Sequence, residues 1–239
     1  TFIAPGRPSE PLSWMPLGDT CDDGDVGQKT LVISYDIENS SGHELSEIWQ
    51  IGATSRLAPA NSDEMETDID NEKKTNYQTL INMLPFGGID FGVTKFSGTN
   101  VTVKFDKHTR ARQLFHTKRK EIIESVSPRD GLISFLDWLE VQKKMAATEN
   151  GSNGEIKLAL LAHGTMDHPC LCNNIAHYGL LDRLVGIVDG FMDSLPYLAV
   201  KLSFAFERLF PGQRFEAHNA LADADALFRV LHRKQKCNP

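Results

Sequence analysis

The sequence predicts an α/β protein with a mixed central sheet flanked by helices. Two apolar runs, residues 30–37 and 156–162, have the composition of strands that are buried on both faces. Apolar residues recur at helical spacing after Pro128, Pro169 and Ala220. Strand and helix patterns follow one another along the chain, which is typical of helices packed on both faces of one sheet.

The composition is that of a globular protein. Of the 239 residues, 41% are hydrophobic and 24% are charged, and no apolar run approaches the length of a membrane span. Residues 1–28 carry Pro, Gly, Ser and Asp without periodicity and predict an extended N-terminal arm. We expect residues 29–239 to form a single domain, because no repeat and no Pro- or Gly-rich linker divides them.

The cysteine pattern bears on the compartment. The spacing of the four cysteines fits neither paired zinc ligands nor a disulfide framework, and the chain shows no basic-then-apolar leader. We therefore expect an intracellular protein, cytoplasmic or nuclear, whose cysteines are reduced thiols. The cysteines are Cys21, Cys170, Cys172 and Cys237.

The first half of the chain predicts mainly strands. Residues 30–37 form the central one, and residues 47–54 predict a second strand antiparallel to it. Residues 57–78 are polar and predict a long loop. Residues 91–96 and 101–105 predict a hairpin or two short edge strands.

The second half predicts helices around the strand at 156–162. Ser127 can cap a helix that begins at Pro128, and Asp130 completes a pair similar to a capping box. Apolar residues then recur at helical spacing as far as Leu139. A second helix is expected to open at Pro169, and the third begins near residue 220.

Charge is distributed unevenly. The net charge of −7 argues against binding nucleic acid over the whole surface. Residues 104–120 nevertheless hold seven Lys and Arg residues against the single acid Asp106, whereas residues 62–72 are acidic. The basic stretch is either a phosphate-binding stripe or a solvated helix face, and charge alone does not separate the two.

Asp36 and Glu38 form the first candidate site. Side chains two residues apart on a strand share a face, so both carboxylates leave the strand on the same side. Two buried like charges are costly unless a cation neutralises them, and carboxylate oxygens suit Mg²⁺ or Mn²⁺. The alternative is that the Asp-x-Glu pair begins a solvated turn.

His218 and Asp223 form the second candidate site. Asp223 falls in the first turn of the last predicted helix, and His218 lies in the loop that enters it. We prefer Asp223 to Asp225 as a metal ligand, because Asp225 would point to another face. An imidazole can accept a proton from water near neutral pH. The alternative is a loop histidine followed by an acid that stabilises a helix N-terminus.

Asp167 is the third candidate. It follows the strand at 156–162 and precedes the helix that Pro169 opens, a position where a further carboxylate could enter a site at the end of a strand. The alternative is a simple helix cap.

Together these segments resemble the DEDDh branch of the 3′-to-5′ exonuclease superfamily. The first motif of that family, Asp-x-Glu after a buried strand, is matched by Asp36 and Glu38. The second, an Asp after a strand ending in Ala-His, is matched by Asp167. The third, His-x4-Asp before Ala, is matched by His218 and Asp223. The segment 47–53 also resembles the second strand of the family.

This resemblance implies an RNase H-like, DnaQ-like exonuclease fold and a catalytic centre with two divalent cations, Mg²⁺ or Mn²⁺. Asp36 would bridge the ions, and Glu38 and Asp223 would complete the shell of one of them. Asp167 would serve the other ion, and His218 would take the proton of the attacking water. All four acids and His218 are thus expected to be catalytic.

The implied partner is single-stranded nucleic acid with a free 3′ end, either DNA or RNA. A homodimer is left open. Residues after Glu38 would lie near the terminal nucleotide, and part of the basic stretch would follow the backbone. The expected substrate-binding residues are Ser40, Ser41, Gly42, His43, His163, Lys118, Arg119 and Lys120.

A narrower similarity supports an alternative function. Residues Phe135–Glu140 and Tyr178–Arg183 resemble the exonuclease-like domain of exuperantia, an insect messenger-RNA-binding protein without the catalytic acids. That resemblance implies an RNA-binding module with weak or no catalysis. The present sequence retains the acids.

Overall fold

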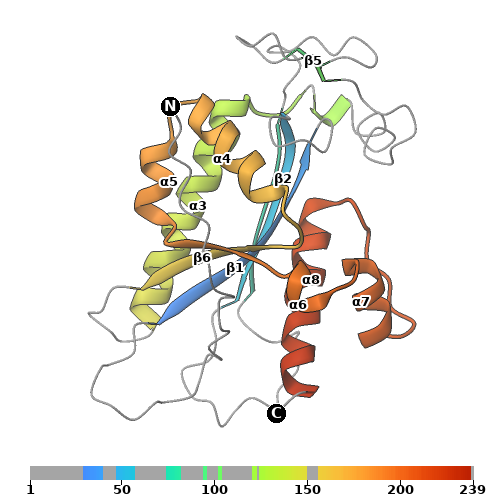
Figure 1. Ribbon diagram of the computed structural model, residues 1–239. Coiled ribbons are helices and arrows are strands. Elements are labelled where there is room, and N and C mark those ends of the chain that lie inside the picture. The colour runs from blue at the N-terminus through green and yellow to red at the C-terminus, as the bar shows by residue number, and fades with distance from the viewer. Residues whose placement is uncertain are drawn as a thin grey trace.

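A five-stranded sheet forms the centre of the computed structural model (Figure 1). Its strand order is β3-β2-β1-β6-β7. The strands are β1 (Thr30–Asn39), β2 (Ile48–Arg56), β3 (Lys74–Leu80), β6 (Lys157–Ala162) and β7 (Gly190–Asp193). The structure describes residues 29–39, 47–56, 74–81, 94–95, 102–103, 120–122, 124–149 and 156–237.

The sheet is mixed, as the sequence predicts. β1 pairs antiparallel with β2, and β2 pairs antiparallel with β3. On its other side β1 pairs in parallel with β6, which pairs in parallel with β7. The strand predicted at 47–54 is therefore confirmed together with its direction. β4 (Thr94–Lys95) and β5 (Thr102–Val103) form a separate antiparallel pair, in agreement with the predicted hairpin.

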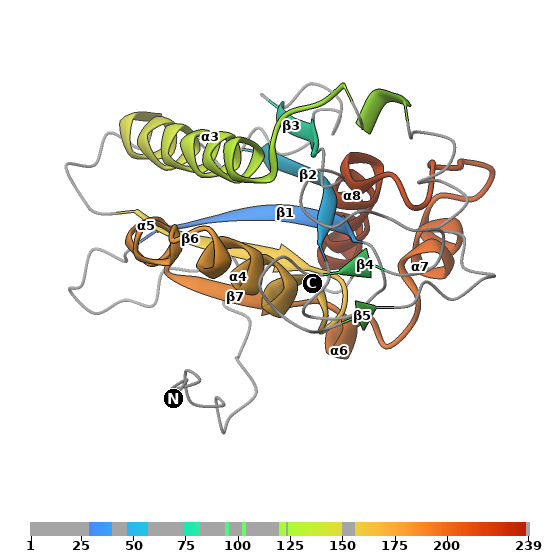
Figure 2. The same cartoon turned by 90° about the horizontal axis from the view of Figure 1, so that it is seen from above.

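Helices cover both faces of the sheet (Figure 2). One face carries α3 (Pro128–Glu149), α4 (Asp167–His177) and α5 (Leu181–Ile187). The other carries α6 (Leu195–Leu198), α7 (Leu202–Leu209) and α8 (Ala220–Cys237). The α/β architecture with flanking helices is thus confirmed.

Alternation along β1 separates the two layers. Ile33, Tyr35 and Ile37 are buried in the core beneath α3 and α4. Val32 packs against the core beneath α8, and the Ser34 hydroxyl donates a hydrogen bond to the Ala224 carbonyl at 2.8 Å. Even-numbered side chains of β1 therefore face α8.

The helix starts follow local chemistry. α3 begins at Pro128 as predicted, where the Asp130 N–H donates to Ser127 Oγ at 3.2 Å and Ser127 Oγ donates to Asp130 Oδ2 at 2.6 Å. α4 begins at Asp167, two residues before the predicted start at Pro169. Proline is tolerated there because the N–H groups of a first turn have no intrahelical partner.

Part of the predicted loop at 57–78 is a strand. β3 occupies Lys74–Leu80, and its sequence is polar because only Tyr77 is buried on this edge of the described sheet. The Tyr77 hydroxyl donates a hydrogen bond to the Gly131 carbonyl at 3.2 Å, which joins β3 to α3. Residues 57–73, like the predicted arm at 1–28, lie outside the described residues.

Two further expectations can be compared with the structure. No helix among the described residues is long and apolar enough to cross a membrane. Cys170 is buried and Cys172 half-buried, and both are free thiols.

Candidate metal centre

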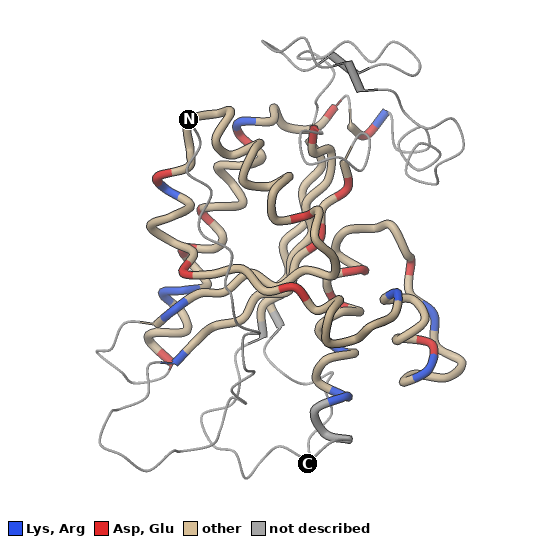
Figure 3. The backbone as a smooth tube through the Cα atoms, in the orientation of Figure 1, with Lys and Arg blue, Asp and Glu red and all other residues tan. Residues whose placement is uncertain are grey.

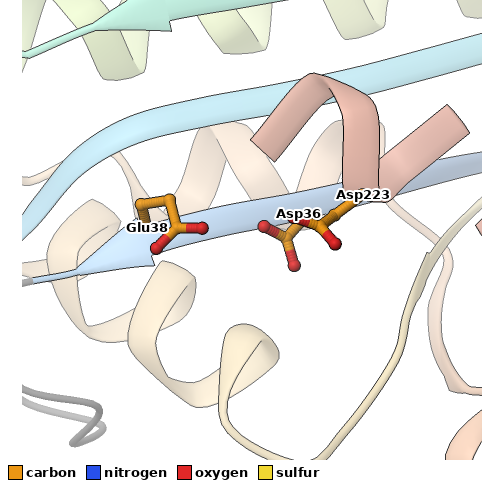
Figure 4. Close-up of side chains that lie close together, drawn as sticks. All are labelled: Asp36, Glu38 and Asp223. Carbon is orange, nitrogen blue, oxygen red and sulfur yellow. The ribbon is translucent and has the colours of Figure 1, made fainter. Parts of the chain in front are cut away.

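Three carboxylates from two elements converge beneath the first turn of α8 (Figure 4). Asp36 and Glu38 come from β1, and Asp223 comes from α8. One ligand oxygen of each lies within 4.8 Å of those of the other two. Glu38 is buried, and Asp36 and Asp223 are half-buried. Three hard oxygen donors at this spacing could hold a metal ion.

The strand register places both acids of β1 beside α8. Asp36 pairs with Gly52 and Glu38 pairs with Gln50 on β2, so these four residues share the face that α8 covers. On the other side of β1, the paired register with β6 ends at Ser34. The two carboxylates therefore lie beyond the end of that pairing, at the carboxyl edge of the parallel strands.

Gly52 permits the close approach of α8. A Cβ atom at Gly52 would lie 2.1 Å from the Leu221 nitrogen and 2.2 Å from the Ala220 carbonyl carbon. Any side chain at this position would thus push away the helix that carries Asp223. The position of Gly52 inside a predicted strand was the available sequence signal, since a glycine there often marks a close backbone approach.

The start of α8 is fixed by polar contacts. The Gln78 amide donates to Asn219 Oδ1 at 3.0 Å, and Asn219 Oδ1 also accepts from the Ala222 N–H at 3.5 Å. The Ala220 N–H donates to Gln50 Oε1 at 3.4 Å. These contacts attach the first turn to β2 and β3 and so orient Asp223.

His218 holds Asp223 through its backbone. Its φ angle is +66°, and this left-handed conformation lets the His218 N–H donate to Asp223 Oδ2 at 2.6 Å. The side chain of His218 is exposed. The backbone of this residue therefore orients an acid, and the residue is exposed to solvent.

The electrostatics of the centre disfavour full ionisation. Burial, and then the negative charges of Asp167, Asp223 and Glu38, hold the pKa of Asp36 well above its ordinary value. Burial also raises the pKa of Asp223 to about 6, against opposing hydrogen bonds from the backbone N–H groups of His218 and Asn219. A bound cation would stabilise the ionised forms of both.

Figure 3 shows how charge is arranged around this centre. Acidic positions lie where β1 and α8 meet, and basic positions of the described chain lie mostly toward the outside of the fold. This distribution agrees with the direction of the pKa shift of Asp36, whose contributing charges are all negative.

Asp167 lies beside the three-acid cluster and is not a member of it. It is the first residue of α4, and its charge is felt at Asp36. Burial, followed by the charges of Asp193 and Asp223, raises the pKa of Asp167 to about 7. The structure thus brings three of the predicted acids into one cluster and places the fourth next to it.

Asp193 is an acid of this region that the sequence analysis missed. It ends β7, and its Oδ1 accepts hydrogen bonds from the Gly164 and Leu195 N–H groups, each at 2.8 Å. It therefore fixes the loop that leads from β6 to Asp167. The four-residue strand that ends in Asp193 has no clear periodicity, and this concealed it in the sequence.

Two of the remaining predicted site residues, His163 and Lys120, lie in the described part of the chain. His163 Nδ1 lies 2.9 Å from Ser194 Oγ, so its ring is held at the end of β7. Lys120 is exposed. Ser40, Ser41, Gly42, His43, Lys118 and Arg119 lie outside the described residues.

Neither a scan against protein-family models nor a search of curated proteins gave a significant match to this chain. The chemistry of the centre is thus the basis for inferring a function. An acid cluster at the edge of a sheet, adjoining a further acid and an exposed imidazole, has the donors for divalent cations and a group that can accept a proton.

Proposed function

We propose that this protein is a metal-dependent 3′-to-5′ exonuclease of the DEDDh type that degrades single-stranded nucleic acid. The observation that carries the proposal is the convergence of Asp36, Glu38 and Asp223, which are 187 residues apart at the extremes (223 − 36), with Asp167 beside them. The motif resemblance requires these residues, and no other set, to meet.

The architecture supports the same proposal. A mixed five-stranded sheet with helices on both faces is compatible with an RNase H-like fold of the DnaQ-like exonuclease type. The acids lie at the carboxyl edge of the parallel strands, where open α/β sheets commonly bind ligands.

The three-acid cluster could hold a metal ion, and the proposed function has two divalent cations, Mg²⁺ or Mn²⁺, at this centre. Asp36, Glu38 and Asp223 would hold one ion, and Asp167 together with Asp36 would hold the other. When bound, the ions would neutralise the charge that develops on the scissile phosphate. Oxygen ligands alone, without sulfur or imidazole in the cluster, favour these hard cations.

His218 is proposed as the general base. Its exposed imidazole can exchange protons with solvent, and its backbone bond to Asp223 keeps it at the edge of the centre. In this arrangement the imidazole would take a proton from the attacking water. The partner would be a strand with a free 3′ end, with His163 and Lys120 among the proposed contacts.

The test is a degradation assay on single strands of DNA and RNA carrying a 5′ label. We expect products that shorten progressively from the 3′ end with Mg²⁺ or Mn²⁺, and no products with a chelator. Blocking the 3′ end should protect the strand. Asp36→Asn and Asp223→Asn should both abolish degradation with the fold retained, whereas Asp182→Asn, an exposed acid on α5, should not alter it.

The result that would overturn the proposal is equally defined. A purified protein that binds RNA and leaves both kinds of strand intact with either metal would instead support the exuperantia-like alternative, an RNA-binding module without catalysis. Degradation that persists in Asp36→Asn would exclude the metal centre as its source.

A further inference from the structure

We propose that Tyr35 and His168 are positioning residues of the acidic centre, because their hydrogen bond fixes Asp167 relative to Asp36. The expected effect on degradation rests on the proposed function. The expected effect on metal binding rests on the geometry alone. It assigns a role to two residues that neither the motifs nor the three-acid cluster includes.

The geometry is a relay through one imidazole. The Tyr35 hydroxyl oxygen lies 2.6 Å from His168 Nδ1, and His168 Nε2 lies 2.9 Å from the Met192 carbonyl oxygen. A carbonyl can only accept, so in the neutral ring Nε2 carries the proton and Nδ1 is left as an acceptor. The Tyr35 hydroxyl is therefore the donor to His168.

Each member of this relay adjoins an acid in the sequence. Tyr35 directly precedes Asp36 on β1, His168 directly follows Asp167 on α4, and Met192 directly precedes Asp193 on β7. The three backbone segments that carry these acids are thus joined at one ring. A shift of α4 relative to β1 would break the hydrogen bond and move Asp167 away from Asp36.

Tyr35 also connects the two faces of the sheet. Its ring lies in the core under α4, 5.6 Å from the His168 ring between centroids, while the next side chain, Asp36, faces α8. His168 in turn lies 5.0 Å from the Phe191 ring. Phenylalanine in place of Tyr35 would preserve these ring contacts and remove only the hydrogen bond to His168. Phenylalanine in place of His168 would also remove the hydrogen bond to the Met192 carbonyl.

The consequence expected is a weaker metal centre. Hydrogen bonds that orient the ligands of a metal typically change metal affinity or activity about 10–100-fold when they are removed. We therefore expect Tyr35→Phe and His168→Phe to raise the Mn²⁺ concentration for half-saturation about 10-fold or more. Degradation at saturating Mn²⁺ should recover more fully than degradation at limiting Mn²⁺.

The experiment measures Mn²⁺ binding by electron paramagnetic resonance on the whole chain without nucleic acid, alongside the urea midpoint of each variant. The matched control is Tyr77→Phe, since Tyr77 is another core tyrosine, whose hydroxyl donates a hydrogen bond to the Gly131 carbonyl and not to a residue of the acidic centre. Asp36→Asn shows the resonance signal that is expected when Mn²⁺ binding at the centre is lost.

The double variant Tyr35→Phe/His168→Phe separates positioning from stability. Tyr35→Phe leaves His168 Nδ1 without its partner, and His168→Phe leaves both the Tyr35 hydroxyl and the Met192 carbonyl without theirs. The double variant leaves only the Met192 carbonyl, so it should be more stable than His168→Phe. Positioning predicts a double variant whose urea midpoint returns toward the wild-type value while its Mn²⁺ affinity stays low. Recovery of Mn²⁺ affinity together with the midpoint would overturn the proposal, as would a Tyr35→Phe protein that binds Mn²⁺ like Tyr77→Phe.

The two proposals fail in different ways. A wild-type protein that binds Mn²⁺ and degrades no strand refutes the exonuclease and leaves the positioning role standing. A protein that degrades strands equally well in all tyrosine and histidine variants, at every Mn²⁺ concentration, refutes only the positioning role. A wild-type protein that binds no Mn²⁺ refutes both.

Discussion

Carboxylates at the two edges of the parallel strands lie in opposite electrostatic environments. At the amino edge, Asp189 accepts hydrogen bonds from Lys143 Nζ and from the Leu158 N–H, each at 2.8 Å. These contacts outweigh the effect of burial and lower the pKa of Asp189. At the carboxyl edge, burial and neighbouring acids raise the pKa of Asp36. The chain supplies the cation at the first edge, and the second edge is suited to a cation from solution.

The difference shows that one edge of the sheet serves stability and that the other has the properties of a functional site. An acid such as Asp189, which is paired with a lysine, contributes to the stability of the fold without a bound ion. Acids gathered without a compensating charge destabilise the folded chain at neutral pH, and such a cost is commonly found where function requires it. Substitutions at the two edges should therefore have unlike consequences.

Among substitutions that leave the acids in place, the largest expected effect on the degradation rate comes from His218. His218→Ala should lower the degradation rate about 10²–10⁴-fold, because the proton acceptor is lost. Its Mn²⁺ affinity should be retained, since the backbone N–H that holds Asp223 is kept in this variant. Rate measurements on labelled single strands, with Mn²⁺ titrations in parallel, check both expectations.

The backbone at this position needs its own control. Because φ is +66° at His218, His218→Asn is a suitable variant, since asparagine is among the non-glycine residues that adopt the left-handed conformation most readily. It should be as slow as His218→Ala. His177→Ala, at an exposed histidine of α4, should have the wild-type rate. A wild-type rate in His218→Asn would remove the imidazole from the mechanism.

The next effect concerns the contact between α8 and β2. Gly52→Ala should lower the free energy of unfolding by about 3 kcal/mol or more, because its Cβ would collide with the backbone of Ala220 and Leu221. It should also weaken Mn²⁺ binding, because Asp223 moves with the helix. Urea denaturation measures the first and spectroscopic titration the second.

Substitution of a second glycine, Gly186, should change the free energy of unfolding in the opposite direction. A Cβ at Gly186 in the helix α5 would meet no atom within 4 Å, so Gly186→Ala should raise stability by up to about 1 kcal/mol through helix propensity. Equal losses in Gly52→Ala and Gly186→Ala would contradict the close approach that positions Asp223.

The smallest effect is a difference in pH dependence between the two edges. The pKa of Asp167 is about 7 in the folded chain against 3.8 for the unperturbed group. Its favourable contribution is therefore complete below about pH 4 and is lost as the pH rises toward 7. With a chelator present, Asp167→Asn should stabilise the protein at pH 7.5 and leave it nearly unchanged at pH 4.

Asp189 provides the reverse case. Its pKa is lowered, so its contribution is present above the unperturbed value and is lost as the pH falls through its folded pKa. Asp189→Asn should thus destabilise at pH 7.5, by about 1 kcal/mol or less for a partly exposed pair. Urea midpoints at pH 7.5 and pH 4 measure the stability changes of Asp167→Asn and Asp189→Asn. Stability changes of the same sign in both variants at pH 7.5 would contradict the comparison of the two edges.

The sequence was informative wherever function depends on local pattern. The strand predicted at residues 30–37 placed Asp36 and Glu38 on one face, because side chains two residues apart on a strand point the same way. The helical spacing of apolar residues after Ala220 predicted where α8 begins. These features depend on the residues within a few positions of each other, which is the range over which propensity and capping act.

What the sequence concealed depends on pairing between distant segments. Asp193 lies close enough to affect Asp167 only because β7 pairs with β6, and Tyr35 meets His168 only because α4 packs under β1. β3 resembles a loop because one side chain in it is buried. Register and packing of this kind are set by the whole sheet, and no local pattern carries them.

The most direct test of the central claim is the anomalous diffraction of a crystal soaked in Mn²⁺. We expect a strong peak at coordination distance from carboxylate oxygens of Asp36, Glu38 and Asp223, and a second peak between Asp36 and Asp167. A well-ordered crystal with Mn²⁺ bound only elsewhere, and with these four side chains ligating nothing, would contradict the assignment of this edge as a metal centre.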